Sequence, residues 1–400
     1  MKRLSDILLV VLFIGFLCFF SIMTWLTPDK DISAVENRAL AQQPILEWET
    51  IMNGEYMENF DSYITDQFYQ RNTWIKSYLQ FQIFTNQTFI YNYHIDGEWV
   101  YPKPFTTIDQ KAIQFAVKNM AELNHYARNH NIELFYFSLP DRRHMIDARY
   151  PRWVAPGVGQ ADKERFLSLL PEEHIQIIDV GDVWNEKYGY SNYRDFYFHT
   201  DHHWNMRGAM AAYEVIQNTL HERSKNFTDG KFNPNSYEKS CLSNKNFYGI
   251  YNQQLYNMLD ASKENMCYYN SKYANESQWI VYVNGMNEDN RQPFSQVYGT
   301  AKNLDKASVS YAEVYANDYR ELHIINPDKQ KDGVKVLVLK DSYANPLIPH
   351  IAEHFYQTTY YDVRHNPGKN LYDFIEQYDY DMILFLYSNG RTLEYLYDFK

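Results

Sequence analysis

Cysteine is scarce in this chain, with three in 400 residues. Cys18 lies inside an apolar run near the N-terminus, which leaves Cys241 and Cys267 for the rest of the chain. These two do not have the spacing of a CxxC motif, so the common metal and thiol-redox sites built on that motif are excluded. In an oxidising compartment the pair could form a disulfide, and the sequence leaves that question open.

The chain also lacks clusters of basic residues. It has 38 Lys and Arg against 50 Asp and Glu, a formal net charge of −12. Nucleic-acid binding needs several Lys or Arg side chains on phosphates, so this balance argues against a nucleic-acid partner and favours a small or neutral substrate. The aromatic content of 17% suits stacking on sugar rings, and a general bias toward tyrosine and asparagine explains it equally well.

The N-terminal residues form one long apolar run, Ile7 to Leu26, preceded by Lys2 and Arg3. About 20 apolar residues can cross a bilayer, and basic residues before them place the N-terminus in the cytoplasm. A cleaved signal peptide is the alternative, but Trp25 and Leu26 stand where such a cleavage site needs small residues. We therefore expect an uncleaved single-pass anchor with the rest of the chain outside the cytoplasm.

Residues 106–400 alternate between helical and strand patterns, which predicts an α/β fold with a central, mainly parallel sheet. Residues 1–28 form the cytoplasmic tip and anchor, and 29–105 a helical and hairpin segment that packs on the main domain. An ordered insertion at about 226–328 interrupts the alternation. The expected strands cover 132–139, 176–180, 334–339, 358–363 and 382–387, and the expected helices 108–129, 205–221, 347–355 and 371–378.

Two segments carry residues suited to chemistry, each beside a predicted helix. One is FYFHTDHHWN, residues 196–205, and the other is VLVLKDSYAN, residues 336–345. In the second, a buried strand ends at Ser342, where the next helix begins. Ligands bind at this edge of α/β sheets, and backbone N–H groups of the first helical turn can face a developing oxyanion. Asp341 just before the helix is a frequent capping residue.

A serine hydroxyl becomes a nucleophile when a base takes its proton and a third group orients that base. Residues two apart in extended backbone point the same way, so Asp201 can orient His203 while His203 faces Ser342. His202 then points away, toward packing or a supporting hydrogen bond. Asn345 and Arg142 are weaker candidates, for the oxyanion and for substrate respectively.

The residue types at 199–203 are also compatible with a metal site or with a structural role. His199, Asp201, His202 and His203 are all competent metal ligands, but no second cluster of similar density supplies the remaining ligands. The histidines could also be buried structural groups. We predict a serine triad that uses no metal and no cofactor.

The two motifs resemble those of the DHHW protein family. Thr200 to Trp204 matches the signature that gives the family its name, and Lys340 to Asn345 matches its second block. Further landmarks are Glu36-Asn37-Arg38, Asp66-Gln67-Phe68 followed by Arg71, and Asp362-Val363-Arg364. Position 69 departs from the pattern, since the family has proline there and this chain has Tyr69.

That family is similar to the SGNH-hydrolase-like proteins of alginate O-acetylation and to PatB-type acetyltransferases of cell-wall polymers. The resemblance implies a three-layer fold, acetyl transfer through an acyl-serine to a polysaccharide, and a multi-spanning membrane acyltransferase that supplies the acetyl group. An acetyl esterase with the same triad and a non-catalytic polysaccharide-binding or assembly protein are the alternatives.

Overall fold

In the computed structural model, most of the buried apolar segments form the strands of one eight-stranded sheet. The structure describes residues 2–33, 35–36, 38–146, 150–189, 193–330 and 333–400. Asn37 of the landmark motif and the side chains of Lys2 and Arg3 lie outside this description. The chain divides into two units, Met1–Asn92 with Asn252–Leu259, and Tyr93–Tyr251 with Asp260–Lys400.

The larger unit carries the sheet, whose strand order is β11-β10-β13-β15-β14-β16-β5-β6. The five strands from β15 to β6 pair in parallel, and β11, β10 and β13 add antiparallel pairs at one side. The strands are β5 (Glu133–Leu139), β6 (Ile175–Asp179), β10 (Ile280–Val283), β11 (Arg291–Gln292), β13 (Glu321–Ile325), β14 (Lys335–Lys340), β15 (Gln357–Tyr361) and β16 (Met382–Ser388).

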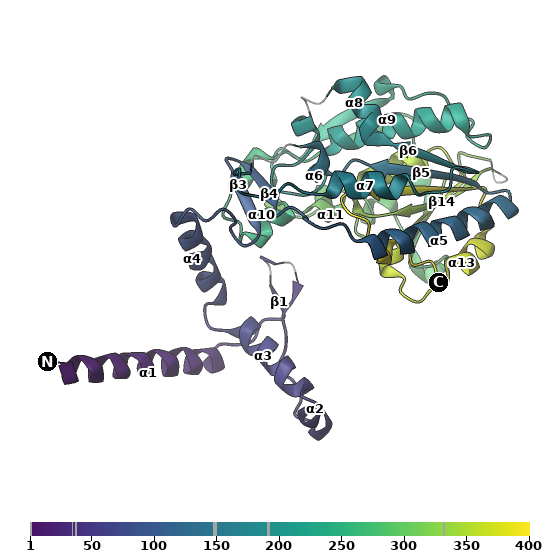
Figure 1. Ribbon diagram of the computed structural model, residues 1–400. Coiled ribbons are helices and arrows are strands. Elements are labelled where there is room, and N and C mark those ends of the chain that lie inside the picture. Colours follow the sequence, from purple (N-terminus) through teal and green to yellow (C-terminus); the bar gives the residue numbers. More distant parts are fainter. Residues whose placement is uncertain (1, 34, 37, 147–149, 190–192, 331–332) are drawn as a thin grey trace. The chain divides into compact units, whose positions relative to one another are not determined.

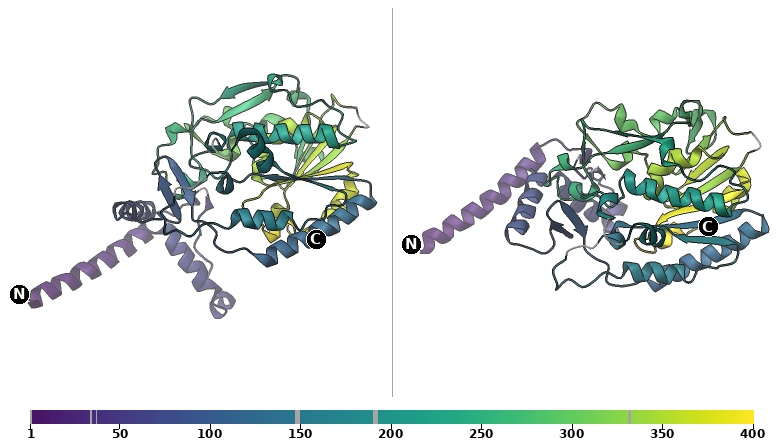
Figure 2. Two further views of the ribbon diagram at one scale, coloured as in Figure 1. Left: turned by 45° about the horizontal axis from the view of Figure 1, so that its top comes forward. Right: turned by 90° about the horizontal axis from the view of Figure 1, so that it is seen from above.

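Helices cover both faces of this sheet (Figure 1). One core includes Val336 and Val338 of β14, and the other includes Leu337 and Leu339, because alternate residues of a strand point to opposite faces. The helices on the first face are α8 (Val180–Tyr188), α9 (Met206–Arg223) and α12 (Ile348–Ala352), and those on the second are α5 (Gln110–Asn129), α7 (Gly159–Leu167) and α13 (Leu371–Tyr378). Two further views show the same three layers (Figure 2), which confirms the predicted fold class.

The expected insertion at 226–328 is ordered and contributes to the sheet. Its strands β10 and β13 extend the sheet beyond β15, and smaller elements lie outside it. A disulfide joins Cys241 to Cys267 across the pairing of β7 with β9. The smaller elements are β7 (Tyr237–Cys241), β8 (Asn246–Phe247), α10 (Ile250–Gln254), β9 (Cys267–Ser271), β12 (Ser308–Val309) and α11 (Tyr311–Val314).

The hairpin of β3 (Tyr93–Asp96) and β4 (Trp99–Pro102) turns at Gly97, whose φ of 62° is a conformation that favours glycine. It belongs to the larger unit, whereas the sequence grouped it with the N-terminal segment. A short helix, α6 (Arg142–Met145), follows β5 in the same unit.

The smaller unit contains the apolar helix and most of the N-terminal family landmarks. Arg38 forms an ion pair with Asp66 (2.6 Å), and Arg71 forms one with Glu36 (3.0 Å), so these charged landmarks stabilise one another. The helices are α1 (Lys2–Leu26), α2 (Trp48–Met52), α3 (Glu55–Gln67) and α4 (Arg71–Phe84), and the strands are β1 (Ile32–Ser33) and β2 (Arg38–Ala39).

Residues Leu4–Leu26 of α1 have a mean hydropathy of 2.8 and are long and apolar enough to cross a membrane. A signal sequence near the N-terminus would have the same length and composition.

Candidate active site

Ser342 lies where β14 ends and a 3-10 helix, η8 (Ser342–Leu347), begins. Asp341 caps this helix, because its carboxylate accepts from the Tyr343 N–H at 2.9 Å. The second carboxylate oxygen accepts from the N–H and the hydroxyl of Ser388, both at 2.7 Å. Asp341 thus ties the end of β14 to the end of the neighbouring strand β16, and the predicted capping role is confirmed.

Asp201 and His203 lie in a loop that precedes α9. His203 Nδ1 is 2.6 Å from Asp201 Oδ1, and His203 Nε2 is 2.8 Å from Ser342 Oγ. Burial alone would raise the pKa of the Asp201 carboxyl, but the charge and hydrogen bond of His203 outweigh it and hold that pKa well below its usual range. An ionised Asp201 fixes the proton on Nδ1, so Nε2 is free to accept the serine proton.

Two backbone N–H groups of the segment 250–251 also hold Asp201 and the residue before it. The Ile250 N–H donates to Asp201 Oδ2 at 2.8 Å, and the Tyr251 N–H donates to the Thr200 carbonyl at 3.0 Å. The two segments lie so close that a Cβ on Gly249 would be 2.3 Å from the Thr200 carbonyl oxygen. Glycine at position 249 therefore permits the approach that completes the hydrogen bonding of Asp201.

Glu264 holds the residues just before Asp201. Its buried carboxylate accepts from the N–H of His199 (2.5 Å), from the N–H of Thr200 (3.2 Å) and from the Thr200 hydroxyl. Burial raises the pKa of Glu264 to about 7, against the opposing effect of these hydrogen bonds.

Tyr311, the first residue of α11, contacts both His203 and Ser342. Its ring lies parallel to the His203 imidazole, with centroids 3.7 Å apart and planes 4° apart, and its hydroxyl donates to the Ser342 carbonyl at 3.2 Å. Ile250, Glu264 and Tyr311 all come from the predicted insertion, and no motif in the sequence singled them out. Their residue types are too common in that segment to signal a role.

Comparisons with known proteins agree with this arrangement. A family model described as an SGNH hydrolase-like domain, acetyltransferase AlgX, matches residues 96–268, which include Asp201 and His203 but end before Ser342. The structure of Bacillus cereus PatB1 superimposes with a TM-score of 0.69 at 29% identity and covers 77% of this chain and 99% of PatB1.

The chain has an SGNH-hydrolase-like α/β fold. This finding confirms the family resemblance predicted from the sequence. A DHHW family protein from Eubacterium siraeum shares the fold at 18% identity, with a TM-score of 0.53 and coverage of 75% of this chain and 91% of that one. No curated protein matches the chain. The family model and the fold together support an acyl-transfer enzyme.

Within the SGNH-like domain, His202 does not point away from His203 as alternation along an extended segment predicts. The two imidazole rings lie side by side with centroids 3.8 Å apart, because residues 200–203 bend rather than extend. The His202 side chain is 34% exposed, and its Nδ1 is 3.5 Å from Asp201 Oδ1. Its carbonyl accepts from the Tyr343 hydroxyl. His202 is thus the exposed member of the pair, at the surface beside the triad.

Asn345 and Arg142 lie near the site with their polar groups engaged elsewhere. The Asn345 amide donates to the Ala316 carbonyl and to Asp318, both at 3.0 Å, and accepts from Lys340 at 2.6 Å. The buried Arg142 guanidinium donates to the carbonyls of Val100 (2.7 Å) and His199 (3.0 Å). In this arrangement Asn345 braces the start of η8 and Arg142 braces the loop that leads to Asp201.

The predicted oxyanion donors of the first helical turn are also partly engaged. The N–H of Tyr343 donates to the Asp341 side chain, and the N–H of Ala344 donates to the Asp341 carbonyl at 3.2 Å. These two N–H groups therefore donate to Asp341 in this structure and do not point toward a substrate oxyanion.

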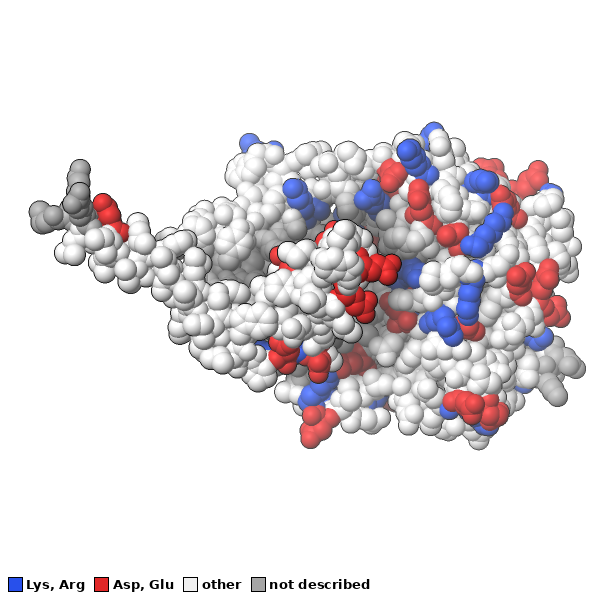
Figure 3. Space-filling model, turned by 90° about the horizontal axis from the view of Figure 1, so that it is seen from below, with Lys and Arg blue, Asp and Glu red and all other residues white. Residues whose placement is uncertain are grey.

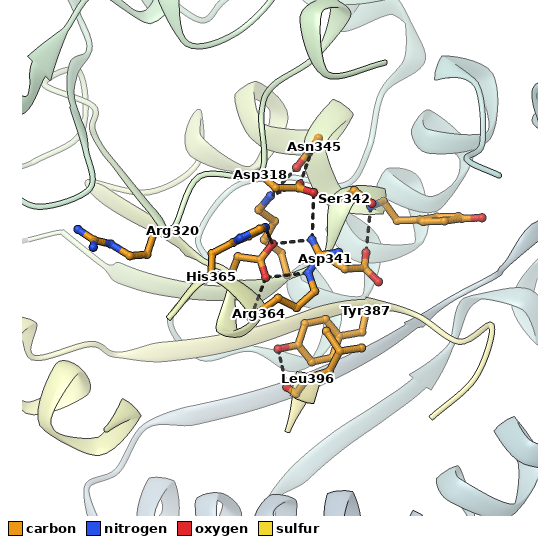
Figure 4. Close-up of polar contacts among 12 residues, drawn as sticks. Asp318, Arg320, Asp341, Ser342, Asn345, Arg364, His365, Tyr387 and Leu396 are labelled. Atoms are coloured by element: carbon orange, nitrogen blue, oxygen red, sulfur yellow. Dashed lines mark hydrogen bonds and ion pairs between the residues drawn. The ribbon is translucent and has the colours of Figure 1, made fainter. Parts of the chain in front are cut away.

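A charged cluster lies on the other side of Ser342 (Figure 4). The Arg364 guanidinium donates to Asp362 at 2.6 Å and lies 3.1 Å from Asp318, while Lys340 lies 3.1 Å from Asp318. Asp318, Asp362 and His365 are close enough together to ligate a metal, but Arg364 and Lys340 already neutralise the two carboxylates.

Asp201, His202 and His203 also offer ligand atoms within 4.8 Å of one another. Both ring nitrogens of His203 already have partners, so a metal held there would displace Asp201 or Ser342 from the imidazole.

Proposed function

We propose that this chain is a serine-dependent O-acetyltransferase that moves an acetyl group through Ser342 to hydroxyls of an extracellular or cell-wall polysaccharide. The observation that supports it is the continuous hydrogen-bonded series from Asp201 through His203 to Ser342, with contacts of 2.6 and 2.8 Å. This series provides the nucleophile, the general base and the orienting carboxylate that acyl transfer needs.

In the first half-reaction, His203 Nε2 takes the proton of Ser342 Oγ as the oxygen attacks the acetyl carbonyl of the donor. The new Oγ–C bond forms, the donor's C–O bond breaks, and His203 returns the proton to the departing oxygen. Asp201 stays ionised and stabilises the imidazolium formed between these steps. The product is acetyl-Ser342.

In the second half-reaction, a sugar hydroxyl gives its proton to His203 Nε2 and attacks the acetyl carbon. The bond to Ser342 Oγ breaks, and that oxygen regains the proton from His203. Transfer requires the sugar to reach the ester before water does. If water takes the place of the sugar, the same triad acts as an acetyl esterase.

In this proposal α1 is an uncleaved anchor that holds the SGNH-like domain outside the cytoplasm. Acetyl groups made in the cytoplasm must then cross the membrane, so the donor is a multi-spanning membrane acyltransferase. The family model names the acetyltransferase AlgX, and this supports acetyl as the transferred group.

The decisive experiment is mass spectrometry of the full chain after mixing with an activated acetate ester. We expect one added acetyl group on the peptide that contains Ser342, and none in Ser342→Ala. A sulfonyl electrophile should label the same residue, since PatB1 has been crystallised with a sulfonyl adduct. Wild-type ester turnover by Ser342→Ala would refute the proposal.

Release of the acetyl group separates the alternatives. Loss of acetyl-Ser342 that accelerates with an added polysaccharide and yields acetylated sugar indicates a transferase. Loss at one rate regardless of acceptor, with free acetate as product, indicates an esterase. A chain that never acquires the acetyl group but binds polysaccharide is the non-catalytic alternative.

A further inference from the structure

Aromatic side chains at the start of α4 and just before it contact the C-terminal half of the apolar helix α1. The Trp74 ring lies 5.3 Å from Phe20 and 6.3 Å from Phe16, and Phe68 stacks on Phe20 at 5.9 Å. These contacts are all within the smaller unit.

A hydrogen bond from the backbone of residue 69 also reaches α1, one helical turn beyond Phe20. The Tyr69 N–H donates to Thr24 Oγ at 3.1 Å. Proline, which the family pattern has at this position, lacks an N–H and could not make this bond. The departure from the pattern at position 69 thus supplies a contact to the apolar helix.

These contacts determine how deep Trp74 lies if α1 crosses a bilayer. A spanning helix needs about 20 residues, and any window of that length within Leu4–Leu26 contains both Phe16 and Phe20. Phe20 is about 9 Å from the end of the helix at a rise of 1.5 Å per residue. Trp74 therefore lies within the hydrocarbon layer or at its boundary, even though α2 and α3 separate α4 from the anchor in the sequence.

The rest of α4 presents a matching surface. Trp74, Tyr78 and Phe81 follow the i, i+4, i+7 spacing of one helix face, with exposed fractions of 44%, 56% and 56%. Phe84 continues that side and is 86% exposed. Lys76 lies on the opposite face, since a helix turns about 100° per residue.

Charged side chains are few on α1, the helix that Trp74 contacts. Figure 3 shows charged side chains of both signs across the larger unit and very few along α1. Tryptophan and tyrosine favour the boundary between headgroups and acyl chains, so exposed Trp74 and Tyr78 suit that boundary.

We infer that α4 is a membrane-embedded helix, whose Trp74, Tyr78 and Phe81 contact lipid in the same leaflet as the C-terminal half of α1. The inference rests on the proposed anchoring by α1. The smaller unit is then held to the bilayer by two helices, one that spans it and one that lies in its outer boundary.

The test uses nitroxide labels on the full chain reconstituted into vesicles of phosphatidylcholine and phosphatidylglycerol. Cys18 is a free, exposed cysteine on α1 and reports on the anchor, while Cys241 and Cys267 are joined to each other and take no label. In a Cys18→Ser background, Tyr78→Cys and Phe81→Cys report the aromatic face, and Lys76→Cys is the matched control on the opposite face. Collision with oxygen and with a water-soluble nickel chelate is measured at each position.

We expect Cys18, Tyr78→Cys and Phe81→Cys to collide several-fold more with oxygen than with nickel, and Lys76→Cys to show the reverse. If Cys18 reports lipid while both aromatic-face labels report water, the inference about α4 is overturned and the anchor stands. Labels at 78 and 81 shielded from both reagents would place this face against protein, which also overturns it. If Cys18 itself reports water, the anchor proposal fails first.

Discussion

The two halves of the candidate active site are held in place by different means. Ser342 is held by regular backbone, since it ends a strand that pairs on both sides and begins a capped helix. Asp201 and His203 lie in a loop without regular structure, and side chains and N–H groups from distant segments hold them. The position of the nucleophile is therefore set by the sheet, and the position of the base is set by several separate contacts, each from a single residue.

The comparison predicts which substitutions affect activity without affecting the fold. Changes near Ser342 that leave β14 intact should leave the nucleophile in position. Changes to Glu264, Gly249 or Tyr311 should displace the base even though none of them takes part in proton transfer.

The largest effect is expected from the triad itself. Ser342→Ala and His203→Ala should each lower kcat/KM for an acetyl ester by about 10⁴-fold or more, because residues that act as a unit fail together. Ser342→Ala removes only one hydroxyl, so its melting temperature should stay near that of the wild type. A double variant no worse than either single variant would confirm that the two act as one unit, and additive losses would contradict it.

Replacing the ring against His203 should have a smaller effect. Tyr311→Leu removes the stacked face, whose attraction for an imidazolium is about 1–2 kcal/mol, so we expect kcat/KM to fall about tenfold. Tyr311→Phe is the matched control, because it keeps the ring and removes only the hydroxyl bonded to the Ser342 carbonyl. Steady-state measurement of kcat/KM for both variants separates the two contributions. An equal loss in both would assign the effect to the hydroxyl.

The close approach behind Asp201 predicts a loss of stability. Gly249→Ala places a Cβ 2.3 Å from the Thr200 carbonyl oxygen, and such overpacking destabilises by about 1–3 kcal/mol. Urea unfolding measures the change. Gly230→Ala is the control, since a Cβ there has no neighbour within 4 Å. Equal stability of the two variants would show that residues 249–251 do not brace the loop.

The smallest effect, taken per pH unit, is a dependence of stability on pH. The pKa of Glu264 is about 7 in the folded chain against 4.5 for an ordinary glutamate, so between these values the folded state holds a proton that the unfolded state releases. Stability contributed by this group falls as pH rises through that window, by about 1 kcal/mol per pH unit. Glu264→Gln should flatten the fall, as urea unfolding across the window would show. An unchanged slope would assign it to other groups.

Much of the fold could be predicted from the sequence. β5, β14 and β16 are nearly continuous buried apolar runs, so their composition and length identify them. β10 and β13 were harder, because they lie in a segment rich in Asn, Ser and Tyr. Their place in the sheet depends on antiparallel pairing with β15, which no local pattern encodes.

The candidate site was predictable to the same extent. Ser342 follows from a strand that ends at a helix, and the nearness of Asp201 to His203 follows from their separation of two residues. The position of His202 did not follow, because the loop bends where alternation assumed extended backbone. Asn345 and Arg142 each follow a predicted strand and carry N–H donors, but no sequence pattern indicates which carbonyl and carboxylate groups accept from them.

The strand order has one further consequence for Ser342. The chain leaves β14 to one side to form β15 and then crosses over to the other side to form β16. The two connections carry α12 and α13 on opposite faces of the sheet. The segments that follow β14 and β15 therefore leave the sheet toward opposite faces, and such a topological switch point is where α/β sheets leave a crevice. Chain connectivity thus places Ser342 at the position in the sheet where folds of this class bind their ligands.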